Sequence, residues 1–415
     1  MAFTFKSLTR EEALFLFAFS VVYSGAFGIT NFHQQIFSYI RNFFVLASVV
    51  LFLLTLFRIF AGRGLNGSLV FILTYTAFIL YGVLLSYIYG GNVFFEENIL
   101  RSIFLAITVI YGYAIFQVVS LIYEDPRRWS LGMPTISVFM ACCALTALAT
   151  GGISLSPLSL NFENIDGGAE LYGQGFTKIC AIAGVYFFVI ATNIRRKALP
   201  IYGLAFAFLI LSILGGSRGD ILAGAIALPM FLMRRPNATN IALVTTGIFI
   251  IFILFIESGS GSEFAVFNRF LQLTDGDYSM RDILFSQVYT LILSESCVIL
   301  GCGFNYFQVF YNYVFGLYPH NVFLETILTF GVLFGLSTVL LAIYGVIILY
   351  IKIGNNPIFY ILLVDLISLQ KSSSLIDFTA LPTLICFAWF GGRALLNTPS
   401  RHTISQQVRN QCNDS

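Results

Sequence analysis

The sequence predicts an all-α integral membrane protein with about twelve transmembrane helices and one large external loop that contains an interfacial helix. Three observations lead to this fold class. Hydrophobic residues make up 58% of the 415 residues and charged residues only 10%, whereas charged residues approach a quarter of a soluble domain. Apolar runs long enough to cross a bilayer recur along the chain, and basic residues concentrate in alternate connections between them.

A transmembrane helix needs about 20 predominantly apolar residues. The predicted spans are residues 13–30, 42–61, 69–89, 99–122, 131–150, 176–194, 198–215, 219–233, 239–256, 321–350, 357–370 and 378–396. The eighth and eleventh are short, so they could be tilted, broken or partly re-entrant. The first apolar run lacks a small-residue cleavage site, and we expect it to be retained as a span.

The predicted domains follow from this count. Nine spans lie within residues 1–256, a large periplasmic loop covers 257–320, three further spans lie within 321–397, and residues 398–415 form a cytoplasmic tail. A second external stretch, residues 156–175, is rich in Gly, Asn and acidic residues. It reads as a solvated connection or as a lip that contacts sugar hydroxyls.

The distribution of basic residues predicts the orientation. With the N-terminus inside, most of the 22 Lys and Arg residues fall on the cytoplasmic side, as the positive-inside rule requires. Both termini are then cytoplasmic, and the large loop faces the exterior of a bacterial inner membrane.

Several function classes are excluded. A net charge of +2 without a basic block gives no surface for a nucleic-acid backbone. The seven cysteines form no CxxC and have no His neighbour at zinc spacing, so we expect no metal and no cofactor. Cys297 and Cys302 both fall in the large loop, and the sequence leaves their pairing open.

Two arginines on the external side are candidates for binding an anion. Arg218 lies in a glycine-rich turn between two apolar segments, where a guanidinium offers a bidentate fork for phosphate. The alternative is an interfacial anchor, or a pair with Asp220. Arg281 begins an apolar-faced stretch that we expect to form the interfacial helix. It could equally belong to a surface charge cluster, and such clusters contribute little.

The interfacial helix is predicted from periodicity alone. Its apolar residues fall near one face at helical spacing. They are Ile283, Leu284, Val288, Leu291 and Ile292.

His320 carries the clearest signal. It stands directly before an apolar run of about thirty residues, longer than a bilayer core needs, so the first turns should project outside. Pro319 suits the start of a helix, and a helix N-terminus attracts anions and disfavours imidazolium. A neutral His320 could accept a proton, and the alternative is an ordinary polar cap. Glu325, one turn further on, could orient the imidazole or face water.

The order of these residues resembles the O-antigen ligase/polymerase family, membrane enzymes that transfer glycans from undecaprenyl pyrophosphate. That family has a Ser-Arg-Gly turn after a mid-chain span, an arginine before a Gly-x-Gly stretch in a late periplasmic loop, and a His-Asn pair opening the next span. The matching positions are Ser217-Arg218-Gly219, Arg281, Gly301-Cys302-Gly303-Phe304, His320-Asn321 and Gly331. The resemblance covers about residues 200–345.

The resemblance implies a glycosyltransferase whose donor is an oligosaccharide on undecaprenyl pyrophosphate, with a flippase and a chain-length regulator as neighbours. It implies catalytic roles for Arg218 and Arg281 at the pyrophosphate and for His320 as general base. We expect substrate contacts from the remaining candidates, which are Ser217, Gly303, Asn321 and Glu325.

Three activities are distinguished within and beyond the family. Ligases have Gly, Thr or Tyr three places after the later glycine, where this chain has Phe334, which favours a polymerase of repeat units over a ligase to lipid A-core. A flippase or transporter should show charged groups within its spans and related halves. Asp365 and Glu325 are the main candidates for such groups, and no related halves are visible, so transport ranks below transfer.

Overall fold

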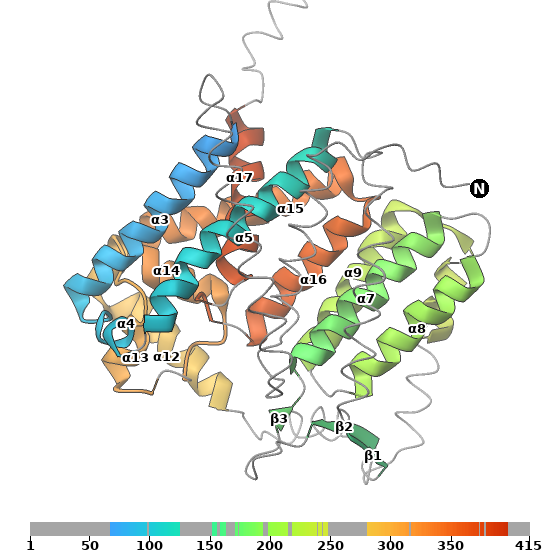
Figure 1. Ribbon diagram of the computed structural model, residues 1–415, viewed down its shortest axis with the longest axis horizontal. Coiled ribbons are helices and arrows are strands. Elements are labelled where there is room, and N and C mark those ends of the chain that lie inside the picture. Colours follow the sequence, from blue (N-terminus) through green and yellow to red (C-terminus); the bar gives the residue numbers. More distant parts are fainter. Residues whose placement is uncertain are drawn as a thin grey trace, which may run out of the picture.

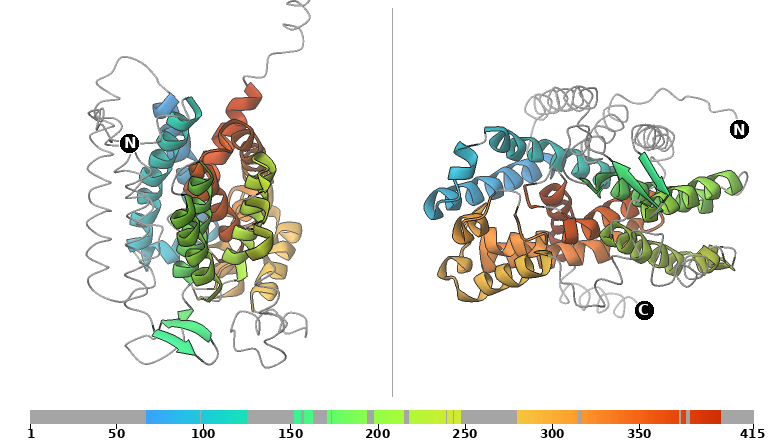
Figure 2. Two further views of the ribbon diagram at one scale, coloured as in Figure 1. Left: turned by 90° about the vertical axis from the view of Figure 1, so that its right-hand side faces the viewer. Right: turned by 90° about the horizontal axis from the view of Figure 1, so that it is seen from below.

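Helices make up most of the described chain and run side by side as a bundle (Figures 1 and 2). This computed structural model describes residues 67–97, 99–124, 152–155, 158–162, 171–172, 174–193, 198–214, 218–238, 240–242, 244–247, 280–314, 317–372, 374–376 and 379–396. The predicted spans at 13–30, 42–61 and 131–150, and most of 239–256, lie outside these residues.

The helix bounds agree with the predicted apolar segments. The helices of the first half are α3 (Gly67–Tyr89), α4 (Val93–Glu96), α5 (Ile99–Glu124), α7 (Gln174–Asn193), α8 (Ala198–Leu214) and α9 (Arg218–Arg234). Those of the second half are α12 (Met280–Ser294), α13 (Tyr306–Tyr311), α14 (Val322–Gly331), α15 (Ser337–Ile353), α16 (Pro357–Ser372) and α17 (Ala380–Leu396). Eight predicted spans are therefore confirmed as helices.

Three of the helices are long and apolar enough to cross a membrane. They cover Leu69–Tyr89, Leu105–Glu124 and Val322–Ile353, with 21, 20 and 32 residues. On α3, Leu80 and Leu84 are 61% and 57% exposed, while Phe71 and Tyr75 are buried in the main core. An exposed leucine-rich face opposite a packed one is what a bilayer requires of a helix at the edge of a bundle.

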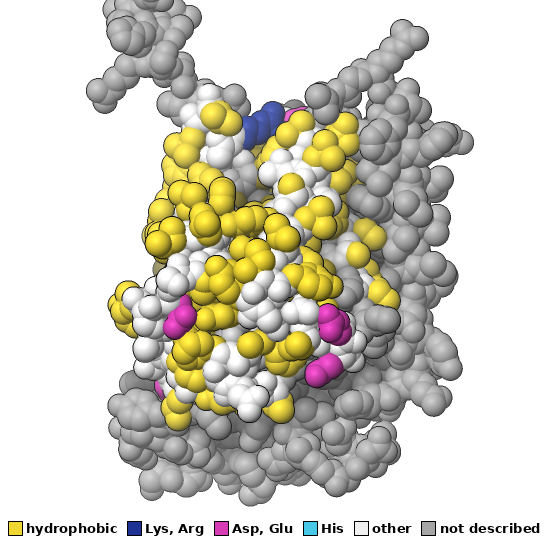
Figure 3. Space-filling model, turned by 90° about the vertical axis from the view of Figure 1, so that its left-hand side faces the viewer, with side chains coloured by type: hydrophobic (Ala, Val, Ile, Leu, Met, Phe, Trp, Pro, Cys, Tyr) yellow, Lys and Arg dark blue, Asp and Glu magenta, His cyan; other side chains and the backbone are white. Residues whose placement is uncertain are grey.

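The described arginine side chains lie at one end of the bundle, whereas Lys178 and Lys371 lie at the other. Arg234 and Arg235 end α9 at the upper end in Figure 1. Arg234 Nη2 donates to Ile351 O at 2.7 Å, and Arg235 Nε donates to Asn355 Oδ1 at 3.1 Å. Figure 3 shows Lys and Arg at this end, acidic side chains mainly in the lower half, and a hydrophobic band between them. This separation agrees with the charge pattern that predicted the orientation.

A small sheet stands where the sequence predicted a solvated connection. Strands β1 (Gly152–Leu155), β2 (Leu158–Phe162) and β3 (Leu171–Tyr172) pair antiparallel in that order. The register places Gly152 opposite Asn161, and Asn161 opposite Tyr172. The sheet lies at the lower end of the bundle, the same end as the start of α7 (Figure 1).

The long apolar helix that begins at Val322 is interrupted at Gly331. There α14 ends, a π-helical segment covers Val332–Leu336, and α15 continues the course. Gly331 has a φ of +82°, a conformation that glycine adopts without strain. The predicted run of about thirty apolar residues is correct in extent, but it is not one continuous α-helix.

A turn between α12 and α13 fills this interruption. The N–H groups of Cys302 and Gly303 donate to Leu328 O and Thr329 O at 2.9 and 3.0 Å. Hydrogen bonds from a neighbouring segment are what a broken helix at membrane depth needs. The Gly301-to-Phe304 stretch, matched to the family by its sequence, therefore acts here as a brace for α14.

The second cluster of buried residues lies under α12. Leu284, Val288 and Leu291 of α12 are buried there, together with the disulfide that joins Cys297 to Cys302. The stretch is a helix, as predicted, but Ile283 is 51% exposed and faces away from this cluster. The apolar face predicted for α12 was therefore wrong at this position.

Candidate functional site

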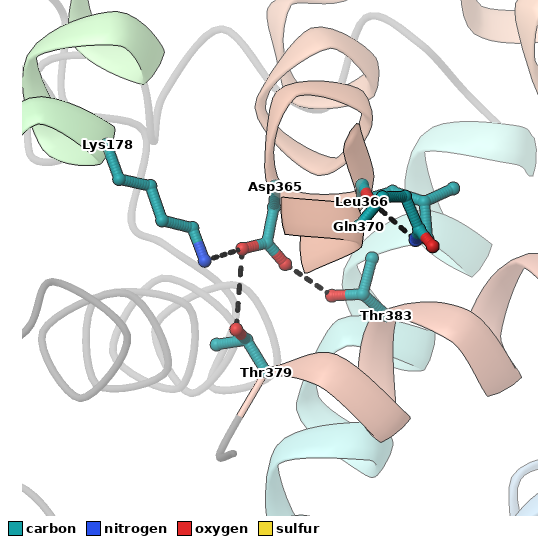
Figure 4. Close-up of polar contacts among 6 residues, drawn as sticks. All are labelled: Lys178, Asp365, Leu366, Gln370, Thr379 and Thr383. Atoms are coloured by element: carbon teal, nitrogen blue, oxygen red, sulfur yellow. Dashed lines mark hydrogen bonds and ion pairs between the residues drawn. The ribbon is translucent and has the colours of Figure 1, made fainter. Parts of the chain in front are cut away.

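The last turn of α16 brings the first turns of two other helices together. At α14, the N–H of Phe323 donates to Gln370 Oε1 at 3.3 Å. The amide of Gln370 is oriented by its own bond, from Nε2 to Leu366 O at 3.0 Å (Figure 4). One free N–H at the start of α14 is thus occupied by α16.

The start of α9 lies against the same turn of α16. A Cβ built on Gly219 would lie 3.1 Å from Cβ of Lys371, so the lysine side chain passes directly over this glycine. Lys371 itself is exposed. Arg218 is the first residue of α9. Its side chain, like Ser217, lies outside the described residues.

His320 stands just before α14. Its φ is +54°, and its ring packs on Tyr318 with 4.1 Å between ring centroids. The side chain is half-buried. The left-handed backbone, uncommon outside glycine and asparagine, turns the chain from the preceding loop into the helix. Backbone outliers of this kind cluster at functional sites.

Asn321 is the N-cap of α14. Its Oδ1 accepts the N–H of Leu324 at 3.0 Å, and its backbone is extended. The helix therefore begins at Val322, close to the predicted start of the span at residue 321, and Pro319 lies before the N-cap. The observed role of Asn321 is capping, which satisfies another N–H of the first turn. His320 remains at the helix N-terminus, one residue before the cap.

Glu325 points into the protein. It is 6% exposed, and its carboxylate accepts Ser374 Oγ at 3.0 Å and the N–H of Leu375 at 2.8 Å. These bonds attach α14 to the connection between α16 and α17. The expectation that Glu325 contacts substrate or faces water is corrected by this burial, and we assign it a structural role.

Gly303 is also placed in the interior. Its φ is +85°, and a Cβ there would lie 2.3 Å from the backbone nitrogen of Ser86 in α3. Backbone contact this close leaves no room for a ligand, so the expected substrate contact at Gly303 is corrected to a packing role.

Arg281 is the second residue of α12. Its side chain lies outside the described residues. The helix itself packs on α14 through Leu284, Val288 and Leu328. Arg281 is therefore held on a helix that lies against the one His320 precedes.

A buried ion pair lies near this region. It was not predicted as part of the site. Lys178 Nζ of α7 lies 2.5 Å from Asp365 Oδ1 of α16 (Figure 4). Thr379 and Thr383 donate to the two carboxylate oxygens at 3.3 and 2.8 Å. The side chains of Lys178 and Asp365 are 16% and 3% exposed. The sequence did contain a signal for this pair, because both charged residues fall inside predicted spans.

This pair can be tested by a double-mutant cycle. Asp365→Leu alone is expected to lower the free energy of unfolding by about 3 kcal/mol, because it removes the carboxylate from a largely buried ammonium. Lys178→Met combined with Asp365→Leu should recover most of that loss. Thermal unfolding of the wild type, of Lys178→Met, of Asp365→Leu and of the double variant measures both quantities. A double variant as unstable as the single one would show that the two residues do not act as a pair.

Within the described residues, no group of three or more His, Cys, Asp or Glu side chains is placed to hold a metal ion. Comparison with protein-family models, with curated proteins and with solved structures gives no match for this chain.

Proposed function

We propose that this chain polymerises oligosaccharide repeat units carried on undecaprenyl pyrophosphate into O-antigen or a similar surface polysaccharide. One observation carries the proposal. The last turn of α16 contacts the starts of both α9 and α14. Arg218 is the first residue of α9, and His320 lies just before α14. The proposal is supported because a basic residue and a candidate base, far apart in sequence, belong to helix starts that both contact the last turn of α16.

The proposed setting is a bacterial inner membrane. We place about twelve spans across it, with the lower end of the bundle in Figure 1 facing the periplasm and both chain ends facing the cytoplasm. The three long apolar helices and the basic residues at the upper end support this orientation. Residues 257–320 then belong to the large periplasmic loop.

Pyrophosphate binding is the first demand of the reaction. The two helix N-termini supply positive dipole ends. The Lys371 side chain lies against Gly219 and adds a positive charge. We assign the guanidiniums of Arg218 and Arg281 to the phosphate oxygens. Charge-assisted hydrogen bonds of this kind stabilise a leaving group as its negative charge develops. We propose that they do so without a metal ion.

Deprotonation of the acceptor is the second demand. The acceptor hydroxyl oxygen attacks the anomeric carbon, and the bond between that carbon and the pyrophosphate oxygen breaks. The hydroxyl proton passes to the imidazole of His320, and undecaprenyl pyrophosphate departs. One displacement with one base inverts the anomeric centre. The packing of the His320 ring on Tyr318 supports a defined position for the proposed base.

Transport is the second candidate function. The buried pair of Lys178 and Asp365 favours it, since intramembrane charges mark ion and substrate pathways in transporters. Asp365 is, however, held by two threonines as well as by the lysine. A fully bonded carboxylate is more easily explained as a fixed brace between α7, α16 and α17 than as a group that changes partner during transport.

The proposed function is tested by deleting the gene from the bacterium that carries it and separating the surface polysaccharide by gel electrophoresis. We expect core that bears a single repeat unit, and a full ladder when the wild-type gene is restored. Bare core with lipid-linked polymer accumulating would identify a ligase instead. Lipid-linked repeat units trapped on the cytoplasmic side would identify a flippase.

Lys371→Ala tests the anion site in the purified enzyme. It is expected to raise KM for the lipid-linked donor about fivefold, corresponding to about 1 kcal/mol for an exposed charge contact. Lys352→Ala is the matched control, because Lys352 lies in the last turn of α15 at the opposite end of the bundle. Equal KM values for the two variants would show that Lys371 does not contribute to the site.

A further inference from the structure

Large apolar side chains are exposed on the turn between α12 and α13. Ile299 and Leu300 are 68% and 55% exposed. They stand beside α3, whose Leu80 and Leu84 are exposed to a similar degree. The turn is attached to α3, since Tyr81 of α3 donates its hydroxyl to Leu300 O at 2.6 Å.

Two helices locate this turn along the bundle. Tyr81 lies about 12 Å before the end of α3 at Tyr89, at 1.5 Å per residue. Gly301 contacts Gly331, which lies about 14 Å along the helix that begins at Val322, by the same rise. Half of a hydrocarbon core is about 15 Å thick. If α3 crosses the membrane with Tyr89 at the edge of the hydrocarbon core, the turn that Tyr81 contacts lies inside one leaflet.

Six backbone polar groups of the turn are bonded to protein. The N–H groups of Leu300 and Gly301 donate to Cys297 O, and those of Cys302 and Gly303 donate to α14. The carbonyls of Leu300 and Phe304 accept hydroxyls from α3, the second from Ser86 Oγ at 3.2 Å. Irregular backbone is tolerated within a bilayer only when its polar groups are satisfied by protein in this way.

Polar groups appear where the chain returns to the end of α3. Tyr306 donates its hydroxyl to Glu295 Oε2 at 2.9 Å, and its ring lies 6.1 Å from that of Tyr89. Burial and the hydrogen bond to Glu295 raise the pKa of Tyr306 to about 12. Tyrosines of this kind are typical of the headgroup level, so the turn reaches below that level and comes back.

We propose that residues 299–304 form a re-entrant turn in the periplasmic leaflet, with Ile299 and Leu300 in contact with lipid acyl chains. The sequence placed this stretch in a water-exposed loop. The disulfide and the glycines around it then build a membrane-embedded support for α14. This inference rests on the proposed membrane placement of α3 and of the Val322 helix, and it is independent of the proposed reaction.

The test uses tryptophan fluorescence in liposomes of brominated phosphatidylcholine. In a background in which Trp129 and Trp389 are replaced by Phe, single tryptophans are introduced as Leu300→Trp, Leu84→Trp and Glu97→Trp. Leu84 lies on the exposed face of α3, and the exposed Glu97 follows the short helix beyond its end. We expect quenching of Leu300→Trp to match that of Leu84→Trp and to exceed that of Glu97→Trp several-fold.

Two outcomes would overturn the proposal in different ways. Quenching of Leu84→Trp but not of Leu300→Trp would place the turn in water and leave the membrane placement of α3 intact. Absence of quenching at both positions would refute that placement as well. A second pair of variants retains both native tryptophans. Leu300→Arg should lower the midpoint of thermal unfolding in liposomes clearly more than Glu97→Arg, and equal midpoints would contradict the proposal.

Discussion

His320→Ala is expected to lower the rate of polymer formation by about 10²–10⁴-fold, the range that a general base contributes. The folded protein should reach the membrane at the wild-type level, because the half-buried ring packs on Tyr318 at the surface of the loop and not in the core. The rate is measured with purified protein and lipid-linked repeat units. His402→Ala is the matched control for removal of an imidazole elsewhere in the chain.

The effect of losing the Asn321 cap must be distinguished from the effect of losing His320. Asn321→Ala removes a bond that holds the first turn of α14 and is expected to cost about 1 kcal/mol of stability. Asn321→Asp keeps a capping oxygen and should restore the stability. Activity of His320→Ala within a factor of a few of wild type would exclude His320 as the base, whatever the cap variants show.

Gly331→Ala and Gly303→Ala are expected to prevent folding. Both residues have positive φ, and a Cβ would lie 2.4 Å from Leu300 C at Gly331 and 2.3 Å from Ser86 N at Gly303. Neither backbone can move without separating α14 or α3 from the turn between them. The cost should exceed about 4 kcal/mol, a loss that few single substitutions reach.

Gly392→Ala is the control for these variants, because no atom lies within 4 Å of a Cβ built there. The measurement is the yield of monodisperse protein after detergent extraction, followed by its midpoint of thermal unfolding. Gly331→Ala behaving like Gly392→Ala would mean that the turn does not brace the helix. The two largest predictions are also distinct, since His320→Ala removes activity from a folded protein.

The course of the helices was predictable, and their interruptions were not. Length and hydropathy located α14 and α15 as one apolar run. The break at Gly331 depends on Cys302 and Gly303, whose N–H groups donate to Leu328 O and Thr329 O from the turn between α12 and α13. A lone glycine inside an apolar run carries no local sign of such a partner. The small sheet at β1 to β3 was missed for a similar reason, because its strands are short and its residues are typical of loops.

The candidate site was predictable only in part. His320 and Arg218 could be selected because helix ends and glycine-rich turns are visible in sequence. The bond between Glu325 and Ser374, and the pairing of Lys178 with Asp365, join residues on different helices. Such pairs depend on how the helices pack. For the same reason Gln370, which contacts the first turn of α14, gave no signal of its own.

Polymerisation by the purified protein is the most direct test. The protein is reconstituted in liposomes with lipid-linked repeat units extracted from the deletion strain, in the presence of a metal chelator. We expect lipid-linked chains of increasing length, release of undecaprenyl pyrophosphate, and loss of both with His320→Ala. Repeat units that remain single, or that lengthen equally with His320→Ala, would contradict the proposed polymerase and its site.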